Sequence, residues 1–155
     1  MDLQEYLNAA VKAQRADSFA KSDQLSLGEM ILKMEPIVKR ERELVVQGKE
    51  ETRVYYDFCG IYPKTLDSWR GIYRELALSW EHNNWKEALT AGEFYLLLVD
   101  AVGKTFMGYK GGDFTMSRQT PVWVSNYGES SHTAVIDIVY NEGIEVLIIT
   151  AYREA

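Results

Sequence analysis

The chain has 155 residues, of which 46% are hydrophobic and 26% charged, a composition typical of one soluble globular domain with a sizeable core. It lacks an apolar run of the roughly 18 residues that a membrane span needs, and its single cysteine, Cys59, excludes an internal disulfide and fits a reducing cytoplasm. The net charge of −6 is concentrated in residues 81–155, where 10 acidic and 5 basic side chains argue against general binding to nucleic acids or anionic membranes.

Residues 1–24 are predicted to form a helix and the connection that follows it. Asp2 and Glu5 have the spacing of a capping box, and apolar residues then recur at helical spacing up to about Ala16. These apolar residues are Leu3, Tyr6, Leu7, Ala10 and Val11. A mobile arm, a dimer contact and a part of the core all stay open as roles for this helix. No basic start precedes an apolar block, so we expect no secretory signal.

Residues 25–88 are predicted to form a first helix–sheet unit. Ser26 and Glu29 have the spacing of a capping box, and Gly48 is the expected end of the helix. Pro36 lies inside the helical pattern without a backbone N–H, so we expect a kink or a break near Glu35. The alternating charges of residues 39–43 are typical of a solvated helix face.

Two strands are predicted after this helix. Arg53–Gly60 is rich in Val, Tyr and Phe, and Glu75–Glu81 alternates large apolar residues with small ones, so the second stretch is the predicted partner of the first. The residues between them are too many for a tight hairpin. Ile61–Arg74 therefore predicts an ordered loop or a short helix that begins at Asp67 or Ser68.

Residues 89–155 are predicted to form a second helix–sheet unit. Thr90 and Glu93 have the spacing of another capping box, and Gly103 supplies the left-handed end of the helix. Three strand candidates follow, at Pro121–Gly128, Thr133–Tyr140 and Ile144–Thr150. Residues 141–143 join the last two strands as a hairpin with glycine at the position that requires positive φ.

Together these elements predict one α+β domain. It contains a mainly antiparallel sheet, two capped helices packed on that sheet, and the N-terminal helix. Both units run from a capped helix into strands, which suggests an internal duplication. Two unrelated helix–strand units would give the same pattern, and the sequence does not distinguish the two origins.

The sequence favours binding over catalysis. Gly103-Lys104-Thr105 lacks the earlier glycine of a phosphate loop and stands where a helix ends, so it would present carbonyls to a phosphate. The two histidines, His82 and His132, lack metal-ligand spacing. We expect no metal and no cofactor, and we assign no catalytic residue.

Aromatic, charged and polar residues gather at predicted loops and strand ends. The candidate binding residues are Tyr62, Asp67, Trp69, Arg70 and Tyr73 in the first half and Tyr109, Lys110, Asp113, Arg118, Trp123, Asn126 and Tyr127 in the second half. Tyr55 and Asp57 belong to the same group. Such residues suit a protein interface, because aromatics and arginine dominate interface energetics, and they also suit a nucleotide pocket. Alternatively, Trp69 and Trp123 belong to the core and Asp67–Arg70 is a structural cap or ion pair.

Three stretches, residues 67–78, 103–116 and 120–128, resemble small uncharacterised proteins encoded by tailed bacteriophages and prophages. The resemblance covers roughly residues 26–150 and implies a phage accessory protein in the bacterial cytoplasm, a class that often inhibits host defence. We therefore predict a non-catalytic protein that binds a host defence protein. The alternatives are a sponge for a nucleotide second messenger and, less favoured, a hydrolase of such a nucleotide. Homo-oligomer formation stays open.

Overall fold

The computed structural model describes residues 24–58, 60–68, 76–107, 113–126 and 129–152, together with Leu3. In chain order these residues form α2 (Leu27–Val46), β1 (Val54–Tyr56), β2 (Leu66–Ser68), β3 (Leu76–Leu78), the 3-10 helix η2 (Trp85–Glu87), α3 (Ala91–Ala101), β4 (Thr105–Met107), β5 (Asp113–Thr115), β6 (Val122–Asn126), β7 (Glu129–Asn141) and β8 (Glu145–Tyr152). Neither α2 nor α3 has the length and apolar character that crossing a bilayer requires. The predicted N-terminal helix lies outside the described residues except for Leu3, which is helical and exposed.

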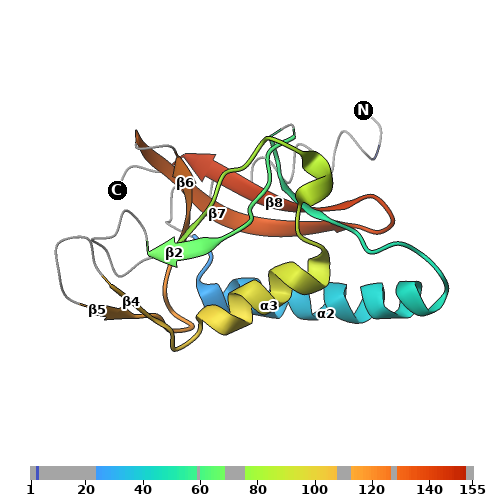
Figure 1. Ribbon diagram of the computed structural model, residues 1–155, viewed down its shortest axis with the longest axis horizontal. Coiled ribbons are helices and arrows are strands. Elements are labelled where there is room, and N and C mark those ends of the chain that lie inside the picture. Colours follow the sequence, from blue (N-terminus) through green and yellow to red (C-terminus); the bar gives the residue numbers. More distant parts are fainter. Residues whose placement is uncertain are drawn as a thin grey trace.

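Six strands form one mixed sheet in the order β1-β8-β7-β6-β3-β2, and β4 and β5 form a separate antiparallel pair. β1 is parallel to β8 and β3 is parallel to β6, whereas the remaining neighbours are antiparallel. Figure 1 shows α2 and α3, which contact each other, on the same side of this curled sheet. The described part of the chain is therefore α+β, with a mixed sheet.

The strand pairing in the first half differs from the prediction. β1 and β3 are not partners, because β1 pairs with β8, and β3 lies between β6 and β2. Parallel neighbours are joined through long crossovers, so their pairing leaves no signal in the local sequence. Residues 66–68, predicted as part of a loop or helix, instead form the edge strand β2, in which Leu66 is buried and Asp67 exposed.

Both helices begin at the predicted residues. Ser26 Oγ accepts a hydrogen bond from Glu29 N at 3.2 Å, and Glu29 Oε1 accepts one from Ser26 N at 3.0 Å. Thr90 and Glu93 repeat this arrangement at the start of α3. Gly48 and Gly103 follow the helix ends with φ of 84° and 78°, as predicted.

α2 continues through Pro36 to Val46, so of the kink or break expected near Glu35 the break does not occur. Pro36 lies on the exposed side of the helix, whereas Met34, Ile37 and Val38 are buried in the main core. Burial of these apolar side chains on both sides of the proline offsets the loss of one backbone hydrogen bond.

Alternation along the strands divides the buried side chains between two faces of the sheet. One face packs on α2 and α3 and contributes Val54, Leu76, Leu78, Val122, Val124, Val135 and Ile148 to the main core. The other face carries a smaller buried cluster that consists of Ala77, Trp123, Ala134, Ile136 and Ile149. Trp123 therefore belongs to the interior, in agreement with the alternative prediction that it is a core residue.

Candidate functional site

A cleft of about 620 Å³ opens where β1 ends beside η2 and the start of β8. We call it the aromatic cleft. Its lining residues are Tyr55, Tyr56, Asp57, Phe58, Gly60, Trp85, Ile144, Glu145 and Leu147. Two of its large apolar side chains face solvent, since Trp85 is 59% exposed and Ile144 is 74% exposed. Large apolar side chains that are exposed together mark interaction surfaces.

Hydrogen bonds hold the aromatic wall of the cleft in place. Asn84 caps η2, because its side-chain oxygen accepts from Lys86 N at 3.1 Å. Tyr55 Oη donates to the carbonyl oxygen of Trp85 at 3.0 Å, which ties β1 to η2. The ring of Tyr55 also meets that of Tyr62 edge-on, with the ring centroids 6.4 Å apart. The contacts between β1 and η2 thus fix the backbone at Trp85, while its side chain is exposed.

The floor of the cleft is a stack of aromatic rings. Tyr56 and Phe58 lie nearly parallel with their centroids 5.1 Å apart, and Phe58 also packs against Trp80 at 5.3 Å. Tyr56 Oη donates to the carbonyl oxygen of Ser79 at 2.7 Å. Burial raises the pKa of Tyr56 well above its ordinary value, so this phenol stays neutral at physiological pH. These rings pack against one another and bring no charge to the cleft.

The other wall of the cleft comes from the β7–β8 hairpin. The hairpin turn has Gly143 at φ 78°, and Ile144 N donates to the carbonyl oxygen of Asn141 at 2.9 Å. Arg40 on α2 contacts Glu142 at the tip, with Nε and Oε1 2.5 Å apart. The hydrogen bond from Arg40 lowers the pKa of the Glu142 carboxyl. The helix thereby orients the hairpin that presents Ile144 and Glu145.

The charged residues that line the cleft, Asp57 and Glu145, are both acidic. Asp57 accepts hydrogen bonds from Thr150 N at 3.2 Å and from Thr150 Oγ1 at 2.8 Å, which fixes its carboxylate against β8. Burial raises the pKa of Tyr55, Glu145 adds to this rise, and the positive charge of Arg53 opposes it. The cleft therefore combines apolar and aromatic walls with negative charge.

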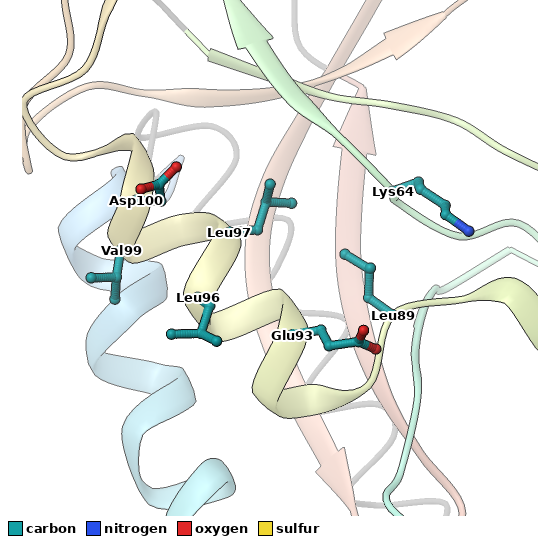
Figure 2. Close-up of a pocket in the computed structure, with 7 residues that line it drawn as sticks. All are labelled: Lys64, Leu89, Glu93, Leu96, Leu97, Val99 and Asp100. Atoms are coloured by element: carbon teal, nitrogen blue, oxygen red, sulfur yellow. The ribbon is translucent and has the colours of Figure 1, made fainter.

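A second depression, of about 450 Å³, runs along the outer side of α3 (Figure 2). We call it the α3 groove. It is lined by Lys64, Leu89, Glu93, Leu96, Leu97, Val99 and Asp100. Lys64 Nζ donates to the carbonyl oxygen of Glu87, the last residue of η2, at 2.9 Å. The segment from Trp85 to Leu89 connects the two depressions, because its first residue lines the cleft and its last lines the groove.

The structure describes six of the twelve candidate binding residues predicted from the sequence. Tyr62 and Trp123 are buried, whereas Asp67 and Arg118 are exposed. Asp113 and Asn126 lie on β5 and β6. Trp69, Arg70, Tyr73, Tyr109, Lys110 and Tyr127 lie outside the described residues. β2 and β4, the strands that directly precede two of these stretches, contact each other.

The sequence prediction missed the two large apolar residues that the cleft exposes. Trp85 lies in the polar stretch of residues 81–86, in which Asn83-Asn84 suits a turn, and Ile144 is the first residue of a predicted strand. A tryptophan directly after Asn83-Asn84, and an isoleucine directly after a hairpin glycine, are the signals that could have indicated exposed positions. Within the described ranges, no His, Cys, Asp or Glu side chains gather in a group of three or more suited to a metal ion.

Comparison with known proteins found no family model, no curated protein and no solved structure that matches the chain. The resemblance to phage-encoded proteins therefore stays a prediction.

Proposed function

We propose that this protein is a non-catalytic binding protein that acts by docking on another protein through the aromatic cleft. The observation that carries this proposal is the joint exposure of Trp85 and Ile144 on the walls of one cleft. A tryptophan that becomes buried on binding, next to an aliphatic side chain, often contributes much of the binding energy of a protein interface, because a large apolar area is removed from water.

The fixed geometry of the cleft supports binding to a protein surface. The Tyr55–Trp85 hydrogen bond and the Arg40–Glu142 contact position both walls before any partner arrives. Association then costs less conformational entropy than it would if these two backbone segments had to be ordered on binding. The acidic second half of the chain favours a partner with a basic surface, since opposite charges accelerate encounter and fix orientation.

The identity of the target class follows from the sequence resemblance. We propose that the protein is phage-encoded, acts in the cytoplasm of the bacterial host and inhibits a component of host defence by occupying its surface. No catalytic step is needed for such inhibition, because a tight complex blocks the target stoichiometrically.

The experiment is affinity capture from bacterial host lysate with matched variants. Wild-type protein is expected to retain a specific protein, and the double variant Trp85→Ser/Ile144→Ser is expected to lose it, because the variant lacks the apolar centre of the interface. Leu32→Ser is the control, since Leu32 is also exposed but lines neither depression. Failure of the folded wild type to capture any partner, or equal capture by the double variant, would contradict the proposal.

A second candidate function, sequestration of a nucleotide messenger, is favoured by the contact between β2 and β4. These strands precede the Trp69-Arg70 and Tyr109-Lys110 stretches in the chain. A thermal-shift screen with cyclic and ADP-ribose-type nucleotides tests it, because a ligand at 100 times its Kd adds about 2.7 kcal/mol to stability. Recovery of the nucleotide unchanged would separate a sponge from a hydrolase.

A further inference from the structure

We propose that the aromatic cleft receives an arginine side chain of the partner protein. This inference rests on the proposed binding function and names the chemistry that the cleft recognises. It differs from the general proposal because it requires a positive charge and a planar guanidinium, whereas apolar docking alone requires neither.

The charges of the cleft favour a cation. Both charged lining residues are carboxylates, with Asp57 at the end of β1 and Glu145 at the start of β8. Thr150 orients the Asp57 carboxylate through two hydrogen bonds, and Glu145 is half-buried at the wall. β1 and β8 are paired neighbours, so a guanidinium would lie on the face of this strand pair, where the Glu145 carboxylate could accept charge-assisted hydrogen bonds, which are stronger than neutral ones.

The aromatic wall favours the same occupant. Lys86 Nζ already lies 5.5 Å from the centre of the Trp85 ring, so this ring holds a cation in the free protein. Tyr55 adds a second aromatic ring, whose hydroxyl group donates a hydrogen bond to the Trp85 carbonyl oxygen. Arginine suits this wall better than lysine, because its planar group stacks on a ring while it donates hydrogen bonds to a carboxylate.

Among the described residues, Arg53 and Lys86 are cations that lie near the cleft. Arg53 donates to the carbonyl oxygen of Ala88, and Lys86 lies over Trp85. Neither of them lines the cleft. An incoming arginine therefore shares the indole ring with Lys86 or displaces it, and the carboxylates supply the attraction that the partner's charge requires.

The test uses short blocked peptides, so that it does not depend on the identity of the partner. The probe is acetyl-Gly-Arg-Gly-amide, and its matched controls carry citrulline, the neutral isostere of arginine, or lysine in the central position. Binding is followed by the NMR shift of the Trp85 indole N–H, which is assigned by its absence in Trp85→Phe. Glu145→Gln tests the carboxylate, and Glu50→Gln is the control, because Glu50 is exposed and lines neither depression.

We expect the arginine peptide to shift the indole signal at millimolar concentration and the citrulline peptide to bind about tenfold more weakly or not at all. Glu145→Gln should weaken arginine binding by about the same factor, whereas Glu50→Gln should not change it. No shift with the arginine peptide, equal binding of citrulline, equal binding of lysine, or an unchanged affinity in Glu145→Gln would overturn the inference.

These outcomes can be told apart from failure of the proposed function. If lysate capture depends on Trp85 but the peptides do not bind, the arginine assignment fails and protein binding stands. If the peptides bind as expected but no protein is captured, the cleft recognises arginine and the proposed docking function fails.

Discussion

One residue on α2, Glu41, shows how a polar group is used inside the fold. Glu41 is 2% exposed, and its carboxylate accepts hydrogen bonds from Thr52 N at 2.5 Å, from Thr52 Oγ1 at 3.0 Å and from Tyr140 Oη at 2.5 Å. It thus connects the helix to the segment before β1 and to β7. The charge run of residues 39–43 predicts a solvated helix face, and at Glu41 this prediction is wrong.

Replacement of Glu41 by alanine should destabilise the protein by about 2–4 kcal/mol, because three buried donors lose their acceptor. Urea denaturation measures this loss. Glu43→Ala on the same helix is the control, since Glu43 pairs with Arg40 at the surface, where an exposed ion pair contributes little to stability. Equal losses in the two variants would show that the Glu41 network does not stabilise the fold.

Tyrosines that hold their protons should make the fold sensitive to alkali. Burial, followed by the hydrogen bond to Glu41, raises the pKa of Tyr140, and burial raises that of Tyr56. The unfolded chain releases these protons near pH 10 while the folded chain retains them, so the free energy of unfolding should fall as pH rises above about 10. Tyr140→Phe should show a shallower fall in urea titrations at increasing pH. A slope identical to wild type would refute this assignment.

At the scale of elements, the two helices begin alike but meet different surroundings. Gly28 and Gly92 occupy the same place in their capping boxes, one residue before Glu29 and Glu93. Gly28 N donates to the carbonyl oxygen of Arg118 at 2.8 Å, so α2 starts in close contact with the turn before β6. A Cβ on Gly28 would lie 2.8 Å from Arg118 Cβ and 2.9 Å from its carbonyl oxygen.

This difference predicts opposite effects of one substitution. Gly28→Ala should destabilise the protein by about 1–3 kcal/mol, because the clash is with backbone and cannot be relieved by a side-chain rotation. Gly92→Ala should be neutral or stabilise by up to about 1 kcal/mol, since its Cβ would meet only Glu51 Oε1 at 3.8 Å and alanine favours the helix. Thermal unfolding of both variants measures the contrast. Equal shifts in Tm would contradict the close approach at Gly28.

At the scale of the whole molecule, the two predicted units are interleaved in one sheet. β1 from the first unit pairs with β8 from the second, and β3 pairs with β6. The aromatic cleft depends on this arrangement, because Tyr55 comes from β1 and Glu145 from β8. The internal duplication stays a prediction. The two units differ in strand pairing, since β6 and β7 of the second unit are partners whereas β1 and β3 of the first unit are not.

Local signals in the sequence predict local structure well. The capping boxes at Ser26 and Thr90 and the glycines that end the helices depend on hydrogen bonds and φ values within a few residues, so the sequence predicts them. The course of α2 through Pro36 and the pairing of β1 with β8 depend on distant residues, and the sequence does not predict them. Tyr55 and Asp57 are among the candidate binding residues, but the sequence does not predict that they share a cleft with Trp85 and Ile144, because this depends on the packing of distant segments.

The most direct test of the central claim is the Kd of the captured partner for three proteins, measured by calorimetry. We expect Trp85→Ser/Ile144→Ser to bind the partner at least about 30-fold more weakly than wild type, because it lacks the interface hot spot. Leu32→Ser should bind like wild type. Equal affinity of the double variant and wild type would show that the partner binds outside the aromatic cleft.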